Sequence, residues 1–262
     1  MKITILGCHG SDGVFDTVDG RRSCSTCGFL LNDSLLLDAG TAATALSMTE
    51  QSRISHVILS HLHFDHIKGL PALADNLSEL VHEPITVAGI PDVIDGLRRH
   101  IFNSEVYPDF FSIPSGERPT LIAKSLKPGG TSCFSGLEIT PILVNHTVPT
   151  SGFIVRHKDS SFVYSGDTGA TEELWHEARR TPHLKAAFIE CSYPDTQTPL
   201  ALASKHLTPS ILAQEVKKLD LPDITLYVYH LKPAYKEQIV KELRALRIST
   251  LHVLEEGQTL TV

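Results

Sequence analysis

The strongest structural signal in the chain is the segment ISHVILSHLHFDHIKG, residues Ile54–Gly69. Its first six residues form a short, mostly apolar run with β-branched side chains, which predicts a buried strand over 54–59. Ser60 follows, and the next six residues contain three histidines and one aspartate. Gly69 and Pro71 then open an amphipathic pattern that predicts a helix over 68–81. We therefore expect a tight loop between strand and helix to present four side chains of the types that bind metals.

The order of these four side chains, H-x-H-x-D-H, has a direct physical interpretation. Neutral imidazole and carboxylate suit a borderline cation such as zinc. Side chains two apart in an extended segment point the same way, so His61 and His63 can bind one ion, and Asp65 follows in the same parity. His66 comes where the chain must already be turning, so it can face a second ion. The alternative is a polar loop with chance histidines, but the pattern after an apolar strand favours a metal site.

Composition limits what kind of protein this can be. The 262 residues are 42% hydrophobic, which is enough for one large core, and no linker or repeat divides them, so we expect a single domain over 1–262. A net charge of −7 and a pI of about 6.0 argue against a protein whose main role is to grip nucleic-acid backbones.

Localisation is predicted from what the sequence lacks. No apolar run approaches the roughly 18 residues that a membrane-spanning helix needs. The opening residues Met1–Leu6 are too short for a signal peptide and predict a first strand. Five cysteines, an odd number, argue for reduced thiols. We therefore expect a cytoplasmic protein that makes no membrane contact, and a homodimer is left open.

Three short motifs near the N-terminus need a structural interpretation. The glycine-rich turn Gly7–Ser11 is expected to let the backbone pass close to the site, with His9 as an ordinary loop histidine. Cys24 and Cys27 form a C-x-x-C pair, which supplies only two zinc ligands, so small residues at a sheet edge are favoured. Asp38 fits equally well as a turn residue or as a hydrogen-bond partner of a ligand histidine.

Four aromatic residues lie within ten positions in the segment 102–111. Aromatic faces can stack on planar heterocycles, so Tyr107, Phe110 and Phe111 are predicted to contact substrate. The alternative is that these rings belong to the hydrophobic core at the end of a helix.

The motif His61-Leu62-His63-Phe64-Asp65-His66 resembles the signature of the metallo-β-lactamase-fold hydrolases. The resemblance implies an α/β fold, namely a four-layer αββα sandwich of two mixed sheets flanked by helices, with the metals at one edge of the packed sheets. Carried over position by position, it assigns one metal to His61, His63 and His146. It assigns the other metal to Asp65, His66 and His230, with Asp167 bridging the two. His146, Asp167 and His230 each follow a predicted strand: 137–144, 161–164 and 224–229.

A second pair of residues narrows the chemistry. Glu190, at the end of a predicted strand, and His206, just before a predicted helix capped by Thr208, resemble a glutamate–histidine pair of the phosphodiesterase branches of this superfamily. Glutamate orients imidazole and raises its pKa. The imidazolium can then protonate an alkoxide leaving group, which a phosphodiesterase needs. The alternative is two unrelated polar residues near a helix start.

The resemblance is closer to the class II cyclic-nucleotide phosphodiesterases. It is carried by four stretches: His61–Leu70, His100–Phe110, Tyr164–Thr168 with Glu190–Asp195, and His206–Pro209 with His230–Pro233. It implies hydrolysis of 3′,5′-cyclic AMP or GMP, a small-molecule phosphodiester, to the 5′-nucleotide. Metal-bound hydroxide would attack phosphorus with Asp65 holding the second metal, and His206, paired with Glu190, would protonate the departing 3′ oxygen.

Cofactor and alternatives follow from the ligand set. Nitrogen ligands favour two Zn²⁺, with Mn²⁺ or iron as alternatives. A tRNA 3′-processing-type endonuclease is the second enzyme hypothesis, and the acidic charge argues against it. A thioesterase or lactonase would need the acid less. A non-catalytic scaffold is disfavoured, because buried histidines and carboxylates without a metal would cost stability.

Overall fold

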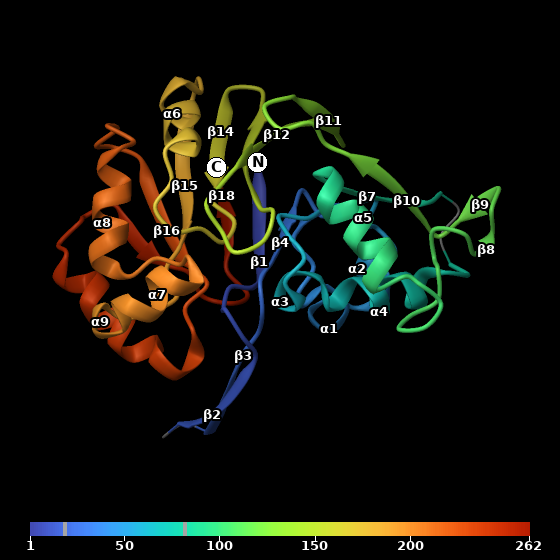
Figure 1. Cartoon of the computed structure of the whole chain (residues 1–262), viewed down its shortest axis with the longest axis horizontal. Coiled ribbons are helices and arrows are strands. Elements are labelled where there is room, and N and C mark those ends of the chain that lie inside the picture. Colours follow the sequence, from blue (N-terminus) through green and yellow to red (C-terminus); the bar gives the residue numbers. More distant parts are fainter. Residues whose placement is uncertain (18–19, 81–82) are drawn as a thin grey trace.

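The computed structural model describes residues 1–17, 20–80 and 83–262, and its main feature is a pair of seven-stranded sheets packed face to face (Figure 1). The first sheet has the order β10 (Leu121–Ser125), β7 (Ile85–Gly89), β6 (His56–Ile58), β5 (Leu35–Leu37), β4 (Gly28–Leu31), β1 (Lys2–Gly7), β18 (Thr259–Thr261). The second has the order β11 (Ser132–Phe134), β12 (Leu137–Leu143), β13 (Ser151–His157), β14 (Ser160–Tyr164), β15 (Leu184–Glu190), β16 (Thr225–Tyr229), β17 (Leu251–Val253). Both are mixed, because parallel pairs such as β5–β6 and β14–β15 lie beside antiparallel pairs.

Helices flank the two sheets on opposite sides (Figure 1). On the side of the first sheet lie α1 (Ala42–Ala45), α2 (Met48–Gln51), α3 (Phe64–Ile67), α4 (Gly69–Leu77) and α5 (Pro91–His100). On the other side lie α6 (Glu173–Arg180), α7 (Thr198–Ser204), α8 (Pro209–Lys217) and α9 (Lys236–Ala245), with the 3₁₀ turns η1 (Asp195–Gln197) and η2 (Pro233–Tyr235). Two small hairpins, β2 (Gly13–Thr17) with β3 (Gly20–Cys24) and β8 (Pro114–Ser115) with β9 (Arg118–Pro119), complete the structure.

Three separate apolar cores show why the protein has four layers. Leu35 and Leu37 of β5 belong to the core between the sheets, whereas Leu36 faces the core under α4 and α5. On β14, Phe162 likewise faces the other sheet and Val163 faces the core under α6, α8 and α9. Successive side chains of a strand point to opposite faces, so strands buried on both faces are apolar throughout. The predicted four-layer αββα sandwich with two mixed sheets is therefore confirmed.

Helix formation begins earlier in the H-x-H-x-D-H motif than expected. α3 begins at Phe64, so Asp65 and His66 lie on a helical turn rather than in an extended segment. α4 begins at Gly69, where a Cβ would lie 2.5 Å from the Ala39 carbonyl oxygen, so glycine permits this close approach. α4 ends at Leu77, so the helix is shorter than the predicted 68–81, whose last residue, Val81, lies outside the described residues.

The aromatic segment after α5 corrects a prediction. Phe110 and Phe111 are 3% and 8% exposed and belong to the core under the first sheet, together with Phe102. The Phe102 ring contacts both of them, as well as the partly buried Tyr107, edge to face. The rings of Phe110 and Phe111 therefore bury apolar area inside the core. The core alternative therefore replaces the predicted substrate contact of Phe110 and Phe111, whereas the substrate contact of the partly buried Tyr107 stays a prediction.

The two chain ends meet on the first sheet. β18 pairs antiparallel with β1, and the Val262 N–H donates to the Met1 carbonyl oxygen at 2.9 Å. The last strand therefore returns from the second half of the chain to complete the first sheet. Within the described residues, every helix is too short or too polar to cross a membrane.

Phe29 of β4 is the aromatic centre of the inter-sheet core. Its ring lies edge-on to Tyr164, Phe188 and Tyr229 of the other sheet, at centroid distances of 5.3, 5.9 and 5.4 Å. We expect Phe29→Ala to lower the free energy of unfolding in denaturant by about 3–5 kcal/mol, because it leaves a cavity.

The matched control for Phe29→Ala is Ile122→Ala on β10, whose side chain is 44% exposed. This substitution should change the free energy of unfolding by no more than about 0.5 kcal/mol. Equal losses in the two variants would show that the inter-sheet aromatic cluster does not stabilise the sandwich.

Candidate metal centre

The predicted ligands meet at one edge of the two packed sheets. β14, β15 and β16 are parallel neighbours, so their carboxyl ends lie at the same edge. Asp167 follows β14, and His230 follows β16 directly. The other ligands come from the loop after β6, from α3 and from the loop after β12: His61, His63, Asp65, His66 and His146.

Four of the predicted ligands form one compact group. Their candidate ligand atoms all lie within 4.8 Å of one another: His61, His63, His146 and Asp167. His146 Nε2 is 3.1 Å from His63 Nδ1, and His61 Nε2 is 3.7 Å from Asp167 Oδ2. Two nitrogens that bind one tetrahedral zinc at about 2.0–2.1 Å lie roughly 3.3 Å apart. The spacing of this group therefore fits a shared cation.

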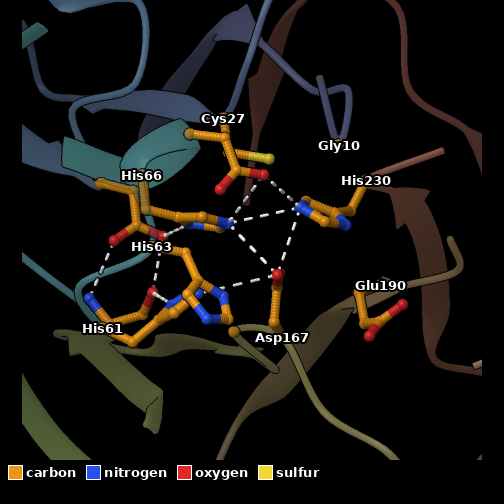
Figure 2. A network of polar contacts seen from close by, with 12 residues as sticks. Gly10, Cys27, His61, His63, His66, Asp167, Glu190 and His230 are labelled. Carbon is orange, nitrogen blue, oxygen red and sulfur yellow. Dashed lines mark hydrogen bonds and ion pairs between the residues drawn. The ribbon is translucent and has the colours of Figure 1, made fainter. Parts of the chain in front are cut away.

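The remaining predicted ligands form a second group, of which His66 and His230 contact Asp167 (Figure 2). The Nε2 atoms of His66 and His230 are 3.3 Å apart, and they lie 3.3 and 3.2 Å from Asp167 Oδ2. Asp65 Oδ2 is 3.3 Å from His230 Nε2 and 4.0 Å from His66 Nε2. Asp167 thus contacts both groups, as a bridging carboxylate would.

Hydrogen bonds at Nδ1 orient the histidine rings. Asp38 Oδ2 is 2.8 Å from His66 Nδ1, so Asp38 serves as a partner of a ligand histidine rather than as a simple turn residue. Ser60 Oγ contacts His61 Nδ1 at 2.9 Å, and the Lys205 carbonyl oxygen lies 3.1 Å from His146 Nδ1. A protonated Nδ1 leaves the lone pair of Nε2 free, so these partners select the tautomer that binds a cation.

Two buried atoms test whether this site suits metal ions. Among the described residues, His61 Nε2 and Asp167 Oδ1 are fully buried and have no hydrogen-bond partner. A buried polar atom without a partner costs about 1–3 kcal/mol. Both atoms belong to the first group, where a cation would satisfy them. The donor set and its orphaned atoms therefore fit divalent metals.

The electrostatics of the site also favour a cation. Burial lowers the pKa of His61 well below its usual value and that of His146 to about 4, so both rings are neutral at pH 7. Burial opposes ionisation of Asp65 and Asp167, but His230 and His66 overcome it and hold the pKa of both carboxyl groups below the usual range. Although burial disfavours charge on His66, Asp167 and Asp38 raise its pKa, which shows that this position attracts positive charge.

Glu190 and His206 are in direct contact beside the ligands. His206 Nδ1 lies 2.7 Å from Glu190 Oε1, and the His206 ring stacks on His230 with centroids 5.4 Å apart. Burial acts to lower the pKa of His206, but Glu190 raises it above its usual value. Thr208 caps α8 as predicted, its side chain accepting from the Ile211 N–H. Glu190 and His206 are therefore a directly bonded pair rather than two unrelated polar residues.

The glycine-rich turn before β2 packs against the last ligand, as expected. A Cβ at Gly10 would lie 2.9 Å from the His230 ring, so only glycine permits this approach (Figure 2). The His230 N–H also donates to the Cys8 carbonyl oxygen at 2.7 Å. His9 Nδ1 lies 2.9 Å from Glu256 Oε1, which agrees with an ordinary loop histidine.

Two residues of the site were missed by the sequence analysis. Ser192 Oγ is 2.8 Å from His230 Nδ1 and 3.1 Å from His206 Nδ1, so it links the last ligand to the Glu190–His206 pair. Cys27 is fully buried within reach of His66 and His230, which corrects its expected place at a sheet edge (Figure 2). Ser192 carries no local signal, and the C-x-x-C motif does not reveal that Cys27 alone reaches the site, because both residues approach it only through contacts between distant segments.

The chain resembles known proteins over most of its length. Residues 34–250 match the family model described as "Beta-lactamase superfamily domain". The chain is 28% identical to a "Probable 3′,5′-cyclic-nucleotide phosphodiesterase" of Yersinia pestis, over 80% of this chain and 67% of that protein. It is also 28% identical to "3′,5′-cyclic-nucleotide phosphodiesterase 1" of Saccharomyces cerevisiae, over 74% of this chain and 62% of that protein. The chain thus spans about two thirds of the length of these relatives.

Solved structures agree with the fold. Unliganded yeast PDE1 superposes with a TM-score of 0.80 at 21% identity, covering 100% of this chain and 99% of that one. The short form of human tRNase Z gives a TM-score of 0.72 at 18% identity, with coverage of 100% and 99%. The sandwich, the ligand edge and the family match over 34–250 lead to one conclusion: the chain belongs to the β-lactamase superfamily.

Proposed function

We propose that this protein is a dinuclear-metal phosphodiesterase that hydrolyses 3′,5′-cyclic nucleotides to 5′-nucleotides. The observation that carries the proposal is the pair of ligand groups that share Asp167, with the Glu190–His206 pair in contact with them. The relatives at 28% identity are named for the same substrate class. Hydrolysis of a phosphodiester needs a site for the anionic oxygens and an acid for the leaving alkoxide. In this proposal, the ligand groups at the sheet edge would supply the site and the Glu190–His206 pair would supply the acid.

The chain's own residues divide into two roles in this proposal. His61, His63 and His146 would hold one metal, Asp65, His66 and His230 the other, and Asp167 both. When bound, two divalent cations, preferably Zn²⁺ with Mn²⁺ or iron as alternatives, supply Lewis acidity and lower the pKa of water to about 7. The ligand residues would also fix the position of the phosphate at the sheet edge.

His206 is the proposed acid for the leaving group. Its Nδ1 is held by Glu190, which leaves Nε2 to deliver a proton to the departing 3′ oxygen. Glu190 in turn accepts from the Thr168 N–H and the Ser192 hydroxyl, both at 3.1 Å, so the carboxylate and the ring are fixed in position.

A substrate panel tests the proposed function. Purified protein loaded with Zn²⁺ or Mn²⁺ should release 5′-AMP or 5′-GMP from the corresponding 3′,5′-cyclic nucleotide. Cleavage of a precursor tRNA, a thioester or a lactone without turnover of either cyclic nucleotide would overturn the assignment.

Asp65 tests the second metal. Asp65→Ala should lower kcat/KM by more than about 100-fold and reduce the bound metal measured by mass spectrometry. Loss of a hydrogen-bond partner of a metal ligand typically costs about 10–100-fold in affinity or activity, so loss of a ligand should cost more. Asp75→Ala, an exposed aspartate of α4, is the control and should retain both. Full activity of the Asp65 variant would contradict a catalytic role of that metal.

His206 tests the proton donor. His206→Ala should slow cyclic AMP or GMP hydrolysis by about 10²–10⁴-fold. Bis(p-nitrophenyl) phosphate should suffer much less, because nitrophenolate leaves without a proton. His176→Ala on α6, an exposed histidine, is the control. Equal losses on alkoxide and nitrophenolate substrates would remove the acid role from His206.

Glu190 tests how the acid is tuned. The Glu190 carboxylate raises the pKa of His206, so the protonated ring persists to higher pH. Glu190→Gln removes that charge and lowers the pKa of His206. The fall of kcat on the alkaline side of the pH profile should therefore begin at lower pH than in the wild type. A profile that does not move would show that Glu190 does not set the ionisation of His206.

A further inference from the structure

A cavity of about 390 Å³ opens next to the ligand edge. It lies between the start of α5 and the loop that joins β12 to β13. Its wall includes His146, one of the predicted ligands of the first group, so the cavity adjoins the proposed catalytic centre. A molecule bound there would sit directly beside the reacting phosphate.

The lining of this cavity has a clear chemical character. Most of it is apolar, and Ile90, Pro91, Leu143 and Val148 contribute to it. Leu143 is 50% exposed, which is unusual for a leucine at the end of a buried strand. The volume lies within the about 300–1,000 Å³ that is typical of small-molecule sites, and such sites combine an apolar wall with a few polar groups.

Asp92 is the charged side chain of the cavity wall that can give specificity. It lies in the first turn of α5 and is exposed. Within the described part of the chain, its carboxylate makes no hydrogen bond or ion pair, so it is free to accept from a ligand.

We propose that this cavity binds the nucleobase of the cyclic nucleotide and that Asp92 selects guanine over adenine. The inference rests on the proposed function, and it assigns a binding site to the nucleobase, the part of the substrate that the metals would not contact. The cavity's apolar wall suits the faces of a planar purine. The Watson–Crick edge of guanine offers two parallel N–H donors, which match the two oxygens of one carboxylate. Adenine presents an acceptor in place of one donor, so its nitrogen would face a negative charge.

The test compares substrates with and without a purine. kcat/KM is measured for three substrates: cyclic GMP, cyclic AMP and methyl p-nitrophenyl phosphate, which has no nucleobase. The proteins compared are the metal-loaded wild type and the variants Asp92→Asn and Leu143→Lys. Wild-type protein should prefer cyclic GMP. Asp92→Asn should reduce the ratio of cyclic GMP to cyclic AMP turnover by about 10-fold, as expected for one bidentate contact.

Leu143→Lys tests the apolar wall independently. It should lower the ratio of cyclic-nucleotide turnover to methyl p-nitrophenyl phosphate turnover by about 10-fold, mainly through KM. The matched control is Ile122→Lys on β10, an exposed strand residue outside the cavity wall, which should leave that ratio unchanged. Thermal unfolding midpoints near that of the wild type show that each variant is folded.

The outcomes separate this inference from the proposed function. Wild-type protein that hydrolyses neither cyclic nucleotide would refute the function itself. Wild-type protein that hydrolyses them, with both substrate ratios unmoved in Asp92→Asn and Leu143→Lys, would refute the nucleobase site alone. A preference for cyclic AMP that Asp92→Asn does not change would overturn the role of Asp92.

Discussion

The buried carboxylate of Asp38 is the interaction on which the site depends. Its Oδ2 accepts from the Ser60 hydroxyl, from His66 Nδ1 and from the Tyr164 hydroxyl, at 2.9, 2.8 and 2.7 Å, and its Oδ1 accepts from the Ser60 N–H. Asp38 follows β5 of the first sheet, whereas Tyr164 ends β14 of the second. A buried carboxylate is tolerated only when hydrogen bonds replace its hydration. These four bonds therefore lock the ligand loop to both sheets at once.

The sandwich concentrates polar groups at one edge of an otherwise apolar interior. His61, His66, Asp167 and His230 are each at most 1% exposed. The Nε2 atoms of the three histidines lie 3.2–3.7 Å from Asp167 Oδ2. Burying these groups so close together would cost free energy if no cation balanced the carboxylate and bound the free nitrogens. The energy that holds them there comes from the three apolar cores around them. Stability and site geometry therefore depend on the same strands.

The arrangement also separates two tasks in space. In the proposed function, the ligand groups and the Glu190–His206 pair would act on the phosphate and its leaving oxygen. The cavity beside His146 lies between α5, on the side of the first sheet, and the loop after β12 of the second sheet. His146 belongs to both regions, whereas Asp92 and Leu143 line the cavity without being predicted metal ligands, so substitutions there would separate substrate choice from metal binding.

Much of the site was predictable from sequence because its signals are local. The apolar run before Ser60, the order of His61, His63, Asp65 and His66, and the strand ends before Asp167 and His230 all follow from residue type and spacing, aided by a family resemblance. Strand faces were also predictable, since the alternation of Leu35, Leu36 and Leu37 needs only the geometry of a strand. Some boundaries were wrong: α3 begins at Phe64, inside the motif, because the chain already turns into a helix before His66.

Other features were decided only by tertiary structure. Phe110 and Phe111 have the same local signal whether they stack on a substrate or fill a core, and only packing against Phe102 made them core residues. Cys27 and Ser192 reach the ligands across long stretches of chain, and no periodicity encodes such contacts. Sequence by itself therefore determined which side chains could bind metals and that strands would carry them. Folding decided which of them share a centre, because that depends on how two sheets from distant parts of the chain pack together.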